Sequence, residues 1–446
     1  MATRGEHLLK ADRAFATCGG LIGRLAAPAF ARVLDQLDAR LLQGGIHATL
    51  PSGERRRIGF HAPGPEPIVE LRSWMALVRL ATSGSVGWYK AWERGEWASP
   101  DPVPLFDLFM RNGESLGDAA RAKGPPRWIN KLAHLARDNA PVRARENIAA
   151  HYDLGNDFYA AWLDRSMTYS SARFRDPLVL SEARSAQSKG VGEEGRPSTA
   201  LRSAQDDREQ ALEQAQLHKI QLLLDRLHLQ PGNRLLEIGC GWGTLAIEAA
   251  KRGARVVGLT LSTEQKAWAD RRIAEEGLSD RIDIRLQDYR DIREPFDAVA
   301  SVEMVEAVGT RWWGAYLDCI AGALKPGGRA ALQFISIRPE LFNRYAASAD
   351  FIQTYIFPGG MLLHEPRFAA MAAERGLSWE DRDGFGLDYA ETLRLWRERY
   401  DEAVRRGALR DFDERFHRLW RYYLMYCEGG FRGQGIDVAQ VTMVRT

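Results

Sequence analysis

Five short apolar segments recur in the second half of the chain, separated by segments whose apolar residues have helical spacing. The apolar segments span residues 234–240, 255–261, 281–287, 296–302 and 328–337. Continuously apolar strands that alternate with helices are typical of a parallel sheet covered on both faces. We therefore predict an α/β fold with a doubly wound, mainly parallel sheet, and we expect its ligands to bind beyond the carboxyl ends of the strands.

The first third of the chain has a different pattern. Residues 11–43 place apolar side chains at helical spacing, and residues 45–53 and 55–64 resemble short strands. This pattern predicts a smaller α+β unit. Because 446 residues exceed one ordinary core and the composition changes near residue 128, we expect two domains, residues 1–127 and residues 128–446.

Residues 182–207 interrupt the second domain with small, polar and charged side chains, and the sequence RSAQ occurs in them twice. Such a composition buries too little apolar surface to order itself. We expect a disordered surface insertion with no catalytic part.

Composition narrows the class of protein. Hydrophobic residues make up 45% of the chain and charged residues 27%, which is typical of a soluble globular protein. No apolar run approaches the roughly 18 residues needed to span a bilayer, and the first residues lack a secretory signal, so we expect a cytoplasmic protein. Four scattered cysteines show no metal-type spacing and are expected to be reduced and mostly structural, with no metal bound: Cys18, Cys240, Cys319 and Cys427.

Charge is unevenly distributed along the chain. Residues 1–150 carry 21 Lys and Arg against 15 Asp and Glu, a net charge of +6, whereas the whole chain has a net charge of only +2. This bias suits an anionic surface, and charge alone does not choose between phospholipid headgroups and nucleic acid.

The strongest local signal is the segment LEIGCGWG, residues 236–243, at the end of the first strand of the sheet. Three alternating glycines, Gly239, Gly241 and Gly243, let a ligand approach the backbone where a Cβ would collide. Dinucleotide loops are spaced GxGxxG, whereas this loop is spaced GxGxG and contains Glu237, which favours a cofactor with an ammonium group. S-adenosylmethionine meets these requirements, and the alternative is a tight turn without a ligand.

Two further strand ends complete the predicted cofactor site. Asp288, after the third strand, is placed to accept from the adenine amino group, with Tyr289 beside it; a helix cap is the alternative role for Asp288. The second strand lacks the usual acidic residue and ends instead with Thr260 and Ser262, followed by Gln265. This set looks like one branch of methyltransferases.

Residues 148–435 resemble the cyclopropane fatty acid synthases, in a bacterial form close to the carboxyl-terminal half of the plant enzymes. The resemblance rests on HYDLGNDFYAAWLD, MTYSSARF, LEIGCGWGTLAIE, VEMVEAVG, LQFISI and DFIQTYIFPGG. Residues 1–127 resemble the amino-terminal lipid-binding domain of that family more weakly. The resemblance implies a class I S-adenosylmethionine-dependent methyltransferase that cyclopropanates the cis double bond of a phospholipid acyl chain. The enzyme would be peripheral on the inner face of the cell membrane and would not act on nucleic acid.

The family is thought to hold a bicarbonate ion as the base that removes a proton from the added methyl group. Its ligands are a Cys, a Glu, a His, an Ile amide and a Tyr. By motif, Glu306, Ile335 and Tyr389 match the Glu, Ile and Tyr, whereas Ser171 stands at the Cys position and Gln333 at the His position. Both replacements can hydrogen-bond an oxyanion. A buried helix cap is the alternative role for Glu306.

Other residues of the resemblance have expected roles beside the cofactor and the substrate. Tyr152, Asp153 and Asn156 are expected to form a lid, with Tyr152 reaching the cofactor carboxylate and a helix N-cap as the alternative for the other two. Aromatic faces can stabilise a carbocation, or can be ordinary core, at Tyr169, Phe174, Phe334, Tyr345 and Tyr355.

The amino-terminal unit supplies two candidate lipid contacts. The aromatic stretch over residues 88–110 is turn-rich and either lines an acyl groove or packs as ordinary core, and residues 55–57, three arginines, either touch lipid phosphates or form a solvated hairpin arm. Methyl or methylene branching of the same alkene, small-molecule N-methylation and a non-catalytic lipid carrier remain alternative functions. A homodimer is one option for the oligomeric state, which the sequence does not determine.

Overall fold

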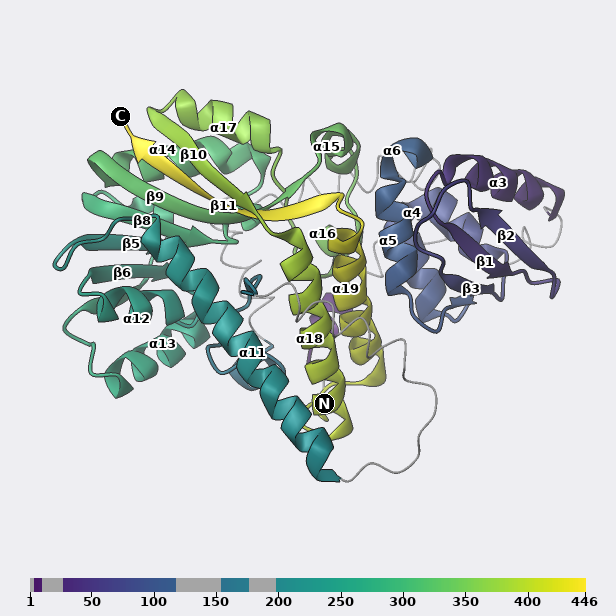
Figure 1. Ribbon diagram of the computed structural model, residues 1–446, viewed down its shortest axis with the longest axis horizontal. Helices are drawn as coiled ribbons and strands as arrows, with labels where there is room; N and C mark the ends of the chain where they lie inside the picture. Colours follow the sequence, from purple (N-terminus) through teal and green to yellow (C-terminus); the bar gives the residue numbers. More distant parts are fainter. Residues whose placement is uncertain (1–3, 10–26, 118–153, 176–197) are drawn as a thin grey trace.

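The computed structural model describes residues 4–9, 27–117, 154–175 and 198–446 (Figure 1). Its described strands form a seven-stranded sheet in the order β10-β11-β9-β8-β5-β6-β7 and a four-stranded sheet in the order β2-β1-β3-β4. The larger sheet belongs to the second half of the chain and the smaller sheet to the amino-terminal unit, which we define as residues 27–117.

The predicted parallel sheet is confirmed. Five strands run parallel at the positions expected from the sequence: β5 (Arg234–Ile238), β6 (Arg255–Thr260), β7 (Ile282–Leu286), β8 (Phe296–Val302) and β9 (Leu324–Ile337). Two antiparallel strands extend the sheet beyond β9, namely β11 (Ile436–Arg445) and β10 (Leu377–Gly384). Every central strand is thereby buried between neighbours, as continuous apolar runs require.

Helices cover both faces of this sheet. One face packs against α14 (Trp313–Ala323) and α17 (Glu365–Ala373), and the other against α11 (Ser198–Asp225), α12 (Thr244–Lys251) and α13 (Thr263–Glu275). Two separate clusters of buried apolar side chains result, one on each face. This is the doubly wound arrangement in which ligand sites lie at the carboxyl ends of the strands.

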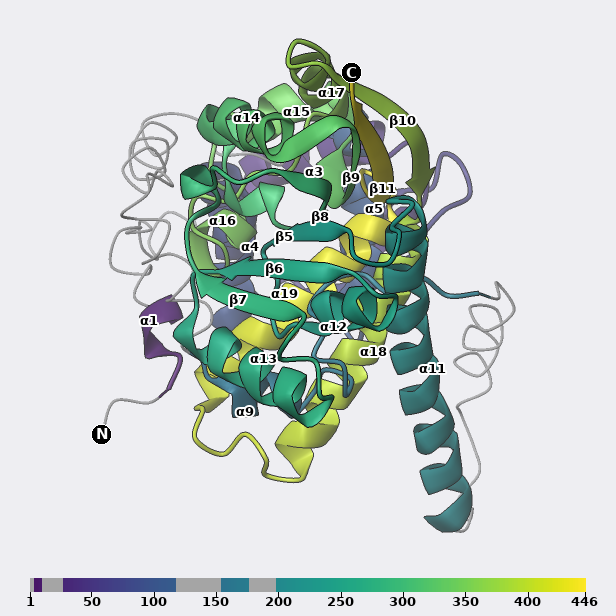
Figure 2. The same ribbon diagram turned by 90° about the vertical axis from the view of Figure 1, so that its left-hand side faces the viewer.

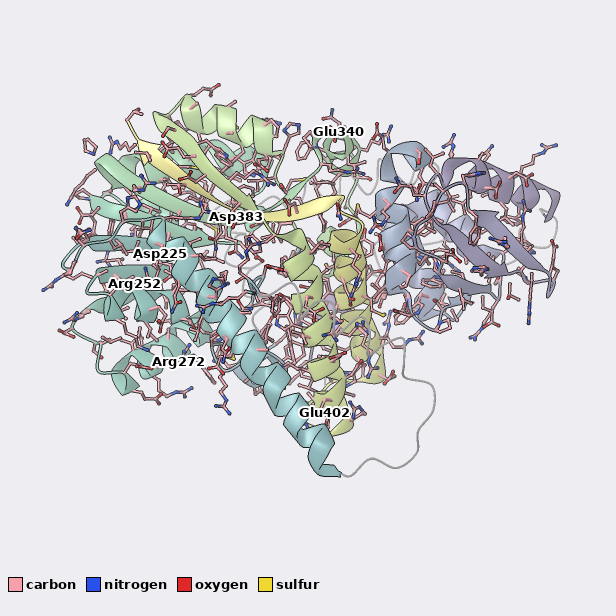
Figure 3. All side chains as sticks on the ribbon, viewed as in Figure 1. Asp225, Arg252, Arg272, Glu340, Asp383 and Glu402 are labelled. Atoms are coloured by element: carbon pink, nitrogen blue, oxygen red, sulfur yellow. The ribbon has the colours of Figure 1, made fainter. Side chains whose placement is uncertain are left out.

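Helix α11 corrects the extent of the predicted insertion. Residues 182–197 lie outside the described residues, but the helix begins at Ser198, so residues 198–207 are helical rather than disordered. The segment ALRSAQDDREQALEQAQ is rich in Ala, Arg, Gln and Glu, which are strong helix formers. Figure 2 shows the amino-terminal end of α11 projecting from the body of the molecule. At its other end, Asp225 accepts a hydrogen bond from Arg252, which follows α12 (2.5 Å, Figure 3).

The amino-terminal unit is α+β, as predicted. Its elements are α3 (Ala27–Arg40), β1 (Gly45–Thr49), β2 (Arg55–Gly59), β3 (Ile68–Leu71), α4 (Met75–Glu93), β4 (Trp97–Ala98), α5 (Val103–Arg111) and α6 (Gly113–Leu116). The stretch expected to be turn-rich over residues 88–110 is instead largely helical, because α4 extends to Glu93 and the proline at position 104 begins α5 where its missing N–H is harmless. The domain boundary expected near residue 127 lies outside the described residues.

Two long helices, α18 (Gly386–Arg405) and α19 (Glu414–Arg432), lie between the large sheet and the amino-terminal unit (Figure 1). One cluster of buried apolar side chains contains residues of both helices and of the amino-terminal unit. Helix α19 approaches α5 closely through glycine: a Cβ at Gly429 would lie 2.3 Å from Cβ of Phe106. The two halves of the chain therefore share one core.

Short helices complete the described chain: α1 (Glu6–Leu9), α9 (Asn156–Ala160), α15 (Pro339–Ala346) and α16 (Phe351–Tyr355). No helix within the described ranges is long and apolar enough to cross a bilayer.

Candidate active site

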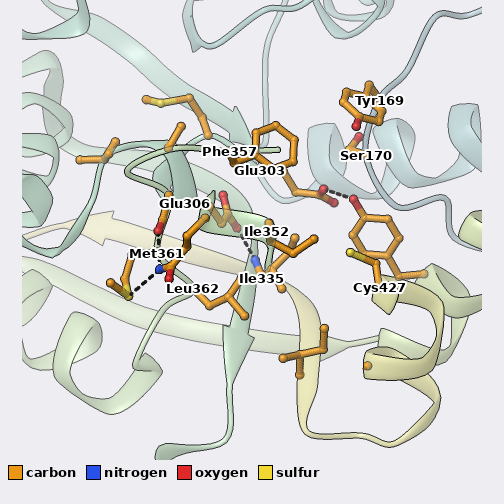
Figure 4. Close-up of a pocket in the computed structure, with 18 of the residues that line it drawn as sticks. Tyr169, Ser170, Glu303, Glu306, Ile335, Ile352, Phe357, Met361, Leu362 and Cys427 are labelled. Carbon is orange, nitrogen blue, oxygen red and sulfur yellow. Dashed lines mark hydrogen bonds between the residues drawn. The ribbon is translucent and has the colours of Figure 1, made fainter. Parts of the chain in front are cut away.

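A cavity of about 560 Å³ lies at the carboxyl ends of the parallel strands, within the size range of small-molecule sites. Its wall contains the glycine loop after β5, the ends of β6 and β8, and residues of the amino-terminal unit. Figure 4 shows the part of this cavity around Glu303 and Glu306. The same cavity is therefore lined by the glycine loop, by the acidic side chains of Glu303 and Glu306, and by an apolar wall.

The glycine loop has the backbone that a close ligand requires. Gly239, Gly241 and Gly243 all have positive φ, at 84°, 51° and 87°, which only glycine adopts easily. Gly239 and Gly241 line the cavity, and a Cβ built on Gly241 would meet no protein atom within 4 Å. Gly243 does not line the cavity; it begins α12, where a Cβ would lie 3.0 Å from Cβ of Ala269. Only Gly241 therefore leaves open space for a ligand at its Cβ position, whereas a Cβ at Gly239 would lie 2.8 Å from Cγ of Met304, so Gly239 and Gly243 also serve packing.

Glu237 lines the cavity beneath this loop and is buried. Its Oε2 atom has no hydrogen-bond partner among the described residues. Burial raises the pKa of this carboxyl well above its usual range. Because a buried polar atom without a partner is costly, it marks the place where a ligand donor binds. The ammonium and hydroxyl groups of S-adenosylmethionine are such donors, so the residues present fit this cofactor.

The polar residues at and after the end of β6, Thr260, Ser262 and Gln265, are hydrogen-bonded to one another. Thr260 donates its hydroxyl to Oε1 of Gln265 (2.8 Å), and Ser262 caps α13 by accepting the N–H of Gln265 (3.2 Å). Thr260 and Gln265 line the cavity, whereas Ser262 does not. Ser262 therefore holds the end of β6 in place rather than facing the ligand space.

Asp288 and Tyr289 line the cavity after β7. Both carboxylate oxygens of Asp288 accept hydrogen bonds from the side chain of Arg290 (2.8 and 2.7 Å), and Oδ1 also accepts the backbone N–H of Arg290 (3.0 Å). Asp288 thereby caps the short 3-10 helix Tyr289–Asp291, as the alternative role required. The contact of Asp288 with adenine stays a prediction.

Of the predicted lid, Tyr152 and Asp153 lie outside the described residues. Asn156 opens α9, whose N-cap is Gly155, so the capping role proposed for Asn156 is wrong. Its side chain instead accepts from Nε1 of Trp242 (2.7 Å) and donates to the carbonyl of Glu264 (3.2 Å). Asn156 therefore ties this segment to the glycine loop and to α13.

The carboxylate of Glu303, at the end of β8, is the centre of a hydrogen-bond cluster that the sequence did not reveal. Its Oε1 accepts from the backbone N–H of Ser171 (2.8 Å) and from Nε2 of Gln333 (2.8 Å). Its Oε2 accepts from the hydroxyl of Tyr389 (2.7 Å, Figure 4). Three of the residues expected to surround a free oxyanion thus surround Glu303.

Two of these three residues lie behind the carboxylate rather than in the cavity wall. Ser171 and Gln333 are 0% and 1% exposed and do not line the cavity, whereas Glu303 and Tyr389 do. The Ser171 hydroxyl donates to the carbonyl of Ala172 (2.9 Å), so its backbone N–H, not the expected hydroxyl, serves the cluster.

Glu306 also lines the cavity, but it has a different environment. Its Oε1 accepts the backbone N–H of Ile335 in β9, and its buried Oε2 has no partner among the described residues. Burial and the nearby negative charge of Glu303 raise the pKa of Glu306 to about 8. The group is therefore a neutral acid at pH 7, and its partner on β9 contradicts the helix-capping alternative.

Of the five aromatic residues predicted to face the substrate, Tyr169 and Tyr345 line the cavity. Phe174, Phe334 and Tyr355 do not. Other rings line the cavity instead: Phe357, from the DFIQTYIFPGG motif, and three rings of α19 that the sequence did not single out, Tyr423, Tyr426 and Phe431. The hydroxyls of Tyr169 and Tyr423, both in the cavity wall, are hydrogen-bonded to each other (2.8 Å).

The amino-terminal unit closes the apolar side of the same cavity. Its contribution comes from α4, α5 and α6, and the large side chains among the lining residues are Leu80, Trp88, Phe106, Phe109, Met110 and Leu116. Part of the predicted aromatic stretch therefore lines the cavity. Another part is ordinary core, since Trp97 is buried and stacks on Trp88 (4.5 Å between ring centroids).

Comparison with known proteins places these features in context. The family model described as mycolic acid cyclopropane synthetase matches residues 139–441. The chain is 37% identical to the tuberculostearic acid methyltransferase UfaA1 of Mycobacterium tuberculosis over 372 residues, covering 82% of this chain and 80% of that protein. It is 36% identical to the cyclopropane-fatty-acyl-phospholipid synthase of Escherichia coli over 375 residues, covering 82% and 85%.

Among solved structures, the mycolic acid cyclopropane synthase CmaA1, in complex with SAH and CTAB, superposes with a TM-score of 0.55 at 28% identity. The match covers 67% of this chain and 98% of that one. The family match over residues 139–441 includes the strands that carry the glycine loop, Glu303 and Glu306.

Proposed function

The chain belongs to the mycolic acid cyclopropane synthetase family, and from this premise we propose that it converts the cis double bond of an unsaturated phospholipid acyl chain into a cyclopropane ring. It is an S-adenosylmethionine-dependent methyltransferase. The observation that carries the proposal is the single cavity, which joins the glycine loop, two buried carboxyl groups and an apolar wall supplied by the amino-terminal unit.

S-adenosylmethionine, when bound, supplies an electrophilic methyl group on a sulfonium. The residues that fit it are Gly241, which leaves room along the backbone, and Glu237, whose buried Oε2 needs a donor; Gly239 lies beside them in the cavity wall. Thr260 and Gln265 form the adjoining wall. These residues would hold the cofactor at the strand ends, in the same cavity as the apolar wall.

An alkene is a weak nucleophile, so the protein must hold it in line with the methyl group and exclude water. The apolar side chains of α4 and α5 suit that task, because they surround an acyl chain without offering hydrogen bonds. Attack by the alkene leaves a cationic carbon, which aromatic faces such as those of Tyr169 and Phe357 stabilise by about 0.5–2 kcal/mol each.

A phospholipid substrate requires contact with a membrane surface. The net charge of +6 over residues 1–150 favours anionic headgroups, and Arg55 and Arg57 project from the edge strand β2 as exposed side chains. Arg56 is partly used within the unit, since it pairs with Asp35 (2.5 Å). We propose that residues 1–150 attach the protein peripherally to the inner face of the cell membrane. Residues 27–117 carry ten Lys and Arg and ten Asp and Glu, so within this unit the exposed arginines, rather than a net charge, would contact the headgroups.

Methyl or methylene branching of the same alkene is the second candidate. The relative UfaA1 is named a methyltransferase, and the departures at Ser171 and Gln333 alter the surroundings of the base. Stopping after methyl transfer and losing a different proton would need only a base in another position. Small-molecule N-methylation fits less well, because a soluble amine has no use for the apolar wall.

Expression in a host rich in unsaturated phospholipids tests the proposal. We expect acyl chains 14 mass units heavier, with NMR signals of a cyclopropane ring, in cells that make the wild type and not in cells that make Gly241→Val. Methyl or vinylidene signals in place of the ring would favour the second candidate. Unchanged acyl chains with an expressed, folded protein would contradict both.

A further inference from the structure

Three of the residues that the family resemblance assigns to a bicarbonate ion already donate hydrogen bonds to a carboxylate of this chain. The N–H of Ser171, the amide of Gln333 and the hydroxyl of Tyr389 all donate to the carboxylate of Glu303, at 2.7–2.8 Å. Gln333 is further fixed because its Oε1 accepts from Nε2 of Gln440 (3.1 Å). A separate bicarbonate does not fit among these residues, since the carboxylate of Glu303 takes their hydrogen bonds.

The backbone of Glu303 is held in a conformation that an ordinary side chain rarely adopts. Its φ is 48°, in the left-handed region, and its N–H donates to the carbonyl of Gln333 (2.7 Å). Strained backbone of this kind persists where the surroundings impose it, and such places cluster at active sites. In this conformation the carboxylate of Glu303 accepts a hydrogen bond from Tyr389, and both residues line the cavity.

We propose that Glu303 is the catalytic base of this enzyme, a carboxylate built into the chain that removes the proton from the added methyl group in place of bicarbonate. The inference rests on the proposed cyclopropanation. It makes Ser171, Gln333 and Tyr389 positioning residues for Glu303 rather than ligands of an external ion.

The step balances in atoms and electrons. The alkene π pair forms a bond to the methyl carbon as the carbon–sulfur bond breaks and its electrons go to sulfur. The positive charge is left on the second alkene carbon. Glu303 then takes a proton from the new methyl group, and the C–H electron pair closes the ring. A carboxylate has about four acceptor positions, and three donors leave one for this proton.

The surrounding charges divide the two glutamates into a base and a neutral acid. Burial raises the pKa of Glu303, but the ammonium of Lys219 and its hydrogen bonds oppose the shift and favour the ionised form. Lys219 is buried and donates to Oγ of Ser170 (2.6 Å). Glu306 has no such donors on Oε2 and stays protonated at pH 7. The pKa values of both glutamates are raised by burial, and only Glu303 has a nearby ammonium and several hydrogen-bond donors that favour its ionised form.

Purified protein with S-adenosylmethionine and unsaturated phosphatidylglycerol vesicles tests the assignment in buffer depleted of carbon dioxide. We expect wild-type turnover to be independent of added bicarbonate. Glu303→Gln should bind S-adenosylmethionine normally and turn over ~10²- to 10⁴-fold more slowly, as is typical of general-base loss. Glu340→Gln, the same change at an exposed position on α15, should behave as the wild type.

Glu303→Gly supplies a second, independent readout. Glycine suits the φ of 48° and leaves the three donors facing the space of the lost carboxylate. This variant should be slow without bicarbonate and recover part of its turnover when bicarbonate is added. Absence of rescue in a variant that still binds the cofactor would contradict the assignment.

Two other outcomes would overturn the proposal. One is wild-type turnover that rises strongly with bicarbonate, and the other is a Glu303→Gln variant as fast as the wild type. Failure of the wild type to alter any acyl chain, with or without bicarbonate, would instead contradict the proposed function itself. The two failures are therefore distinguishable.

Discussion

Glu303 and Glu306, three residues apart after β8, are coupled through charge: the negative charge of Glu303 is one of the causes that raise the pKa of Glu306 to about 8. The two carboxyl groups have different partners, with Tyr389 on Glu303 and the amide of Ile335 on Glu306. One site thus holds two glutamates whose hydrogen-bond donors differ.

The first prediction follows from the protonated state of Glu306. A carboxyl whose folded pKa lies above its unfolded value binds its proton more tightly in the folded state, so its contribution to stability falls as pH rises from about 4.5 to 8. Glu306→Gln cannot ionise and removes that loss. We expect the Tm of the variant minus that of the wild type to be a few degrees larger at pH 8 than at pH 5.

The same variant should keep its turnover at pH 7 within about tenfold of the wild type, because Gln can still accept from the Ile335 amide and mimics a neutral acid. Loss as large as that expected for Glu303→Gln would show that Glu306 acts ionised. Scanning calorimetry and an acyl-product assay at matched pH values check both parts.

The second prediction concerns Gly241→Val. The side chain would enter the space of the cofactor, so S-adenosylmethionine binding should fall by at least 100-fold, while the positive φ costs about 1–2 kcal/mol of stability. Gly277→Val is the matched control, since Gly277 also has a positive φ and open space at Cβ but does not line the cavity. Calorimetric titration with equal affinity in both variants would contradict the placement of the cofactor.

The third prediction concerns the contact between α19 and α5. Gly429→Val should destabilise the protein by about 1–3 kcal/mol, because the added atoms overlap Cβ of Phe106 and the backbone of Asp107. Gly322→Val, on α14, has no atom within 4 Å of its Cβ and serves as the control for helix propensity. Thermal unfolding that gives equal losses in the two variants would show that α19 and α5 separate easily.

The fourth prediction concerns the membrane surface. Binding to vesicles with anionic lipid should weaken as salt rises, because exposed charges are screened beyond a Debye length of ~8 Å near 0.15 M. Arg55→Gln with Arg57→Gln should weaken it about tenfold, whereas Arg405→Gln with Arg406→Gln, also exposed but at the end of α18, should not. Sedimentation with vesicles measures this, and binding that ignores salt would indicate apolar insertion instead.

Continuous apolar runs made the central strands predictable. Strand β10 was not predicted, because its sequence LSWEDRDG is polar and its pairing depends on β11, more than fifty residues later. Helices α4 and α5 were misjudged for a related reason: aromatic residues, Gly and Pro favour turns locally, and packing on α19 overrides that preference.

The cofactor loop was predictable because it is contiguous, whereas the Glu303 cluster is not. Its members come from residues 171, 303, 333 and 389, and no local pattern reports that these positions meet. The sequence held an indirect signal. The motif VEMVEAVG contains a second glutamate, and the same chain lacks the expected Cys and His. Glu303 supplies a carboxylate at the place where the expected Cys and His ligands of bicarbonate are replaced. The three differences therefore concern one site.

Helices α18 and α19 and the amino-terminal unit share one core, and this determines whether the unit can be removed from the enzyme. Helix α18 carries Tyr389 and so belongs to the catalytic cluster, while α19 forms the floor on which the amino-terminal unit rests. Removing that unit would expose tyrosines and tryptophans of the shared core to solvent. Calorimetric melting should accordingly show a single cooperative transition. The amino-terminal unit and the helix that carries Tyr389 are therefore expected to unfold together.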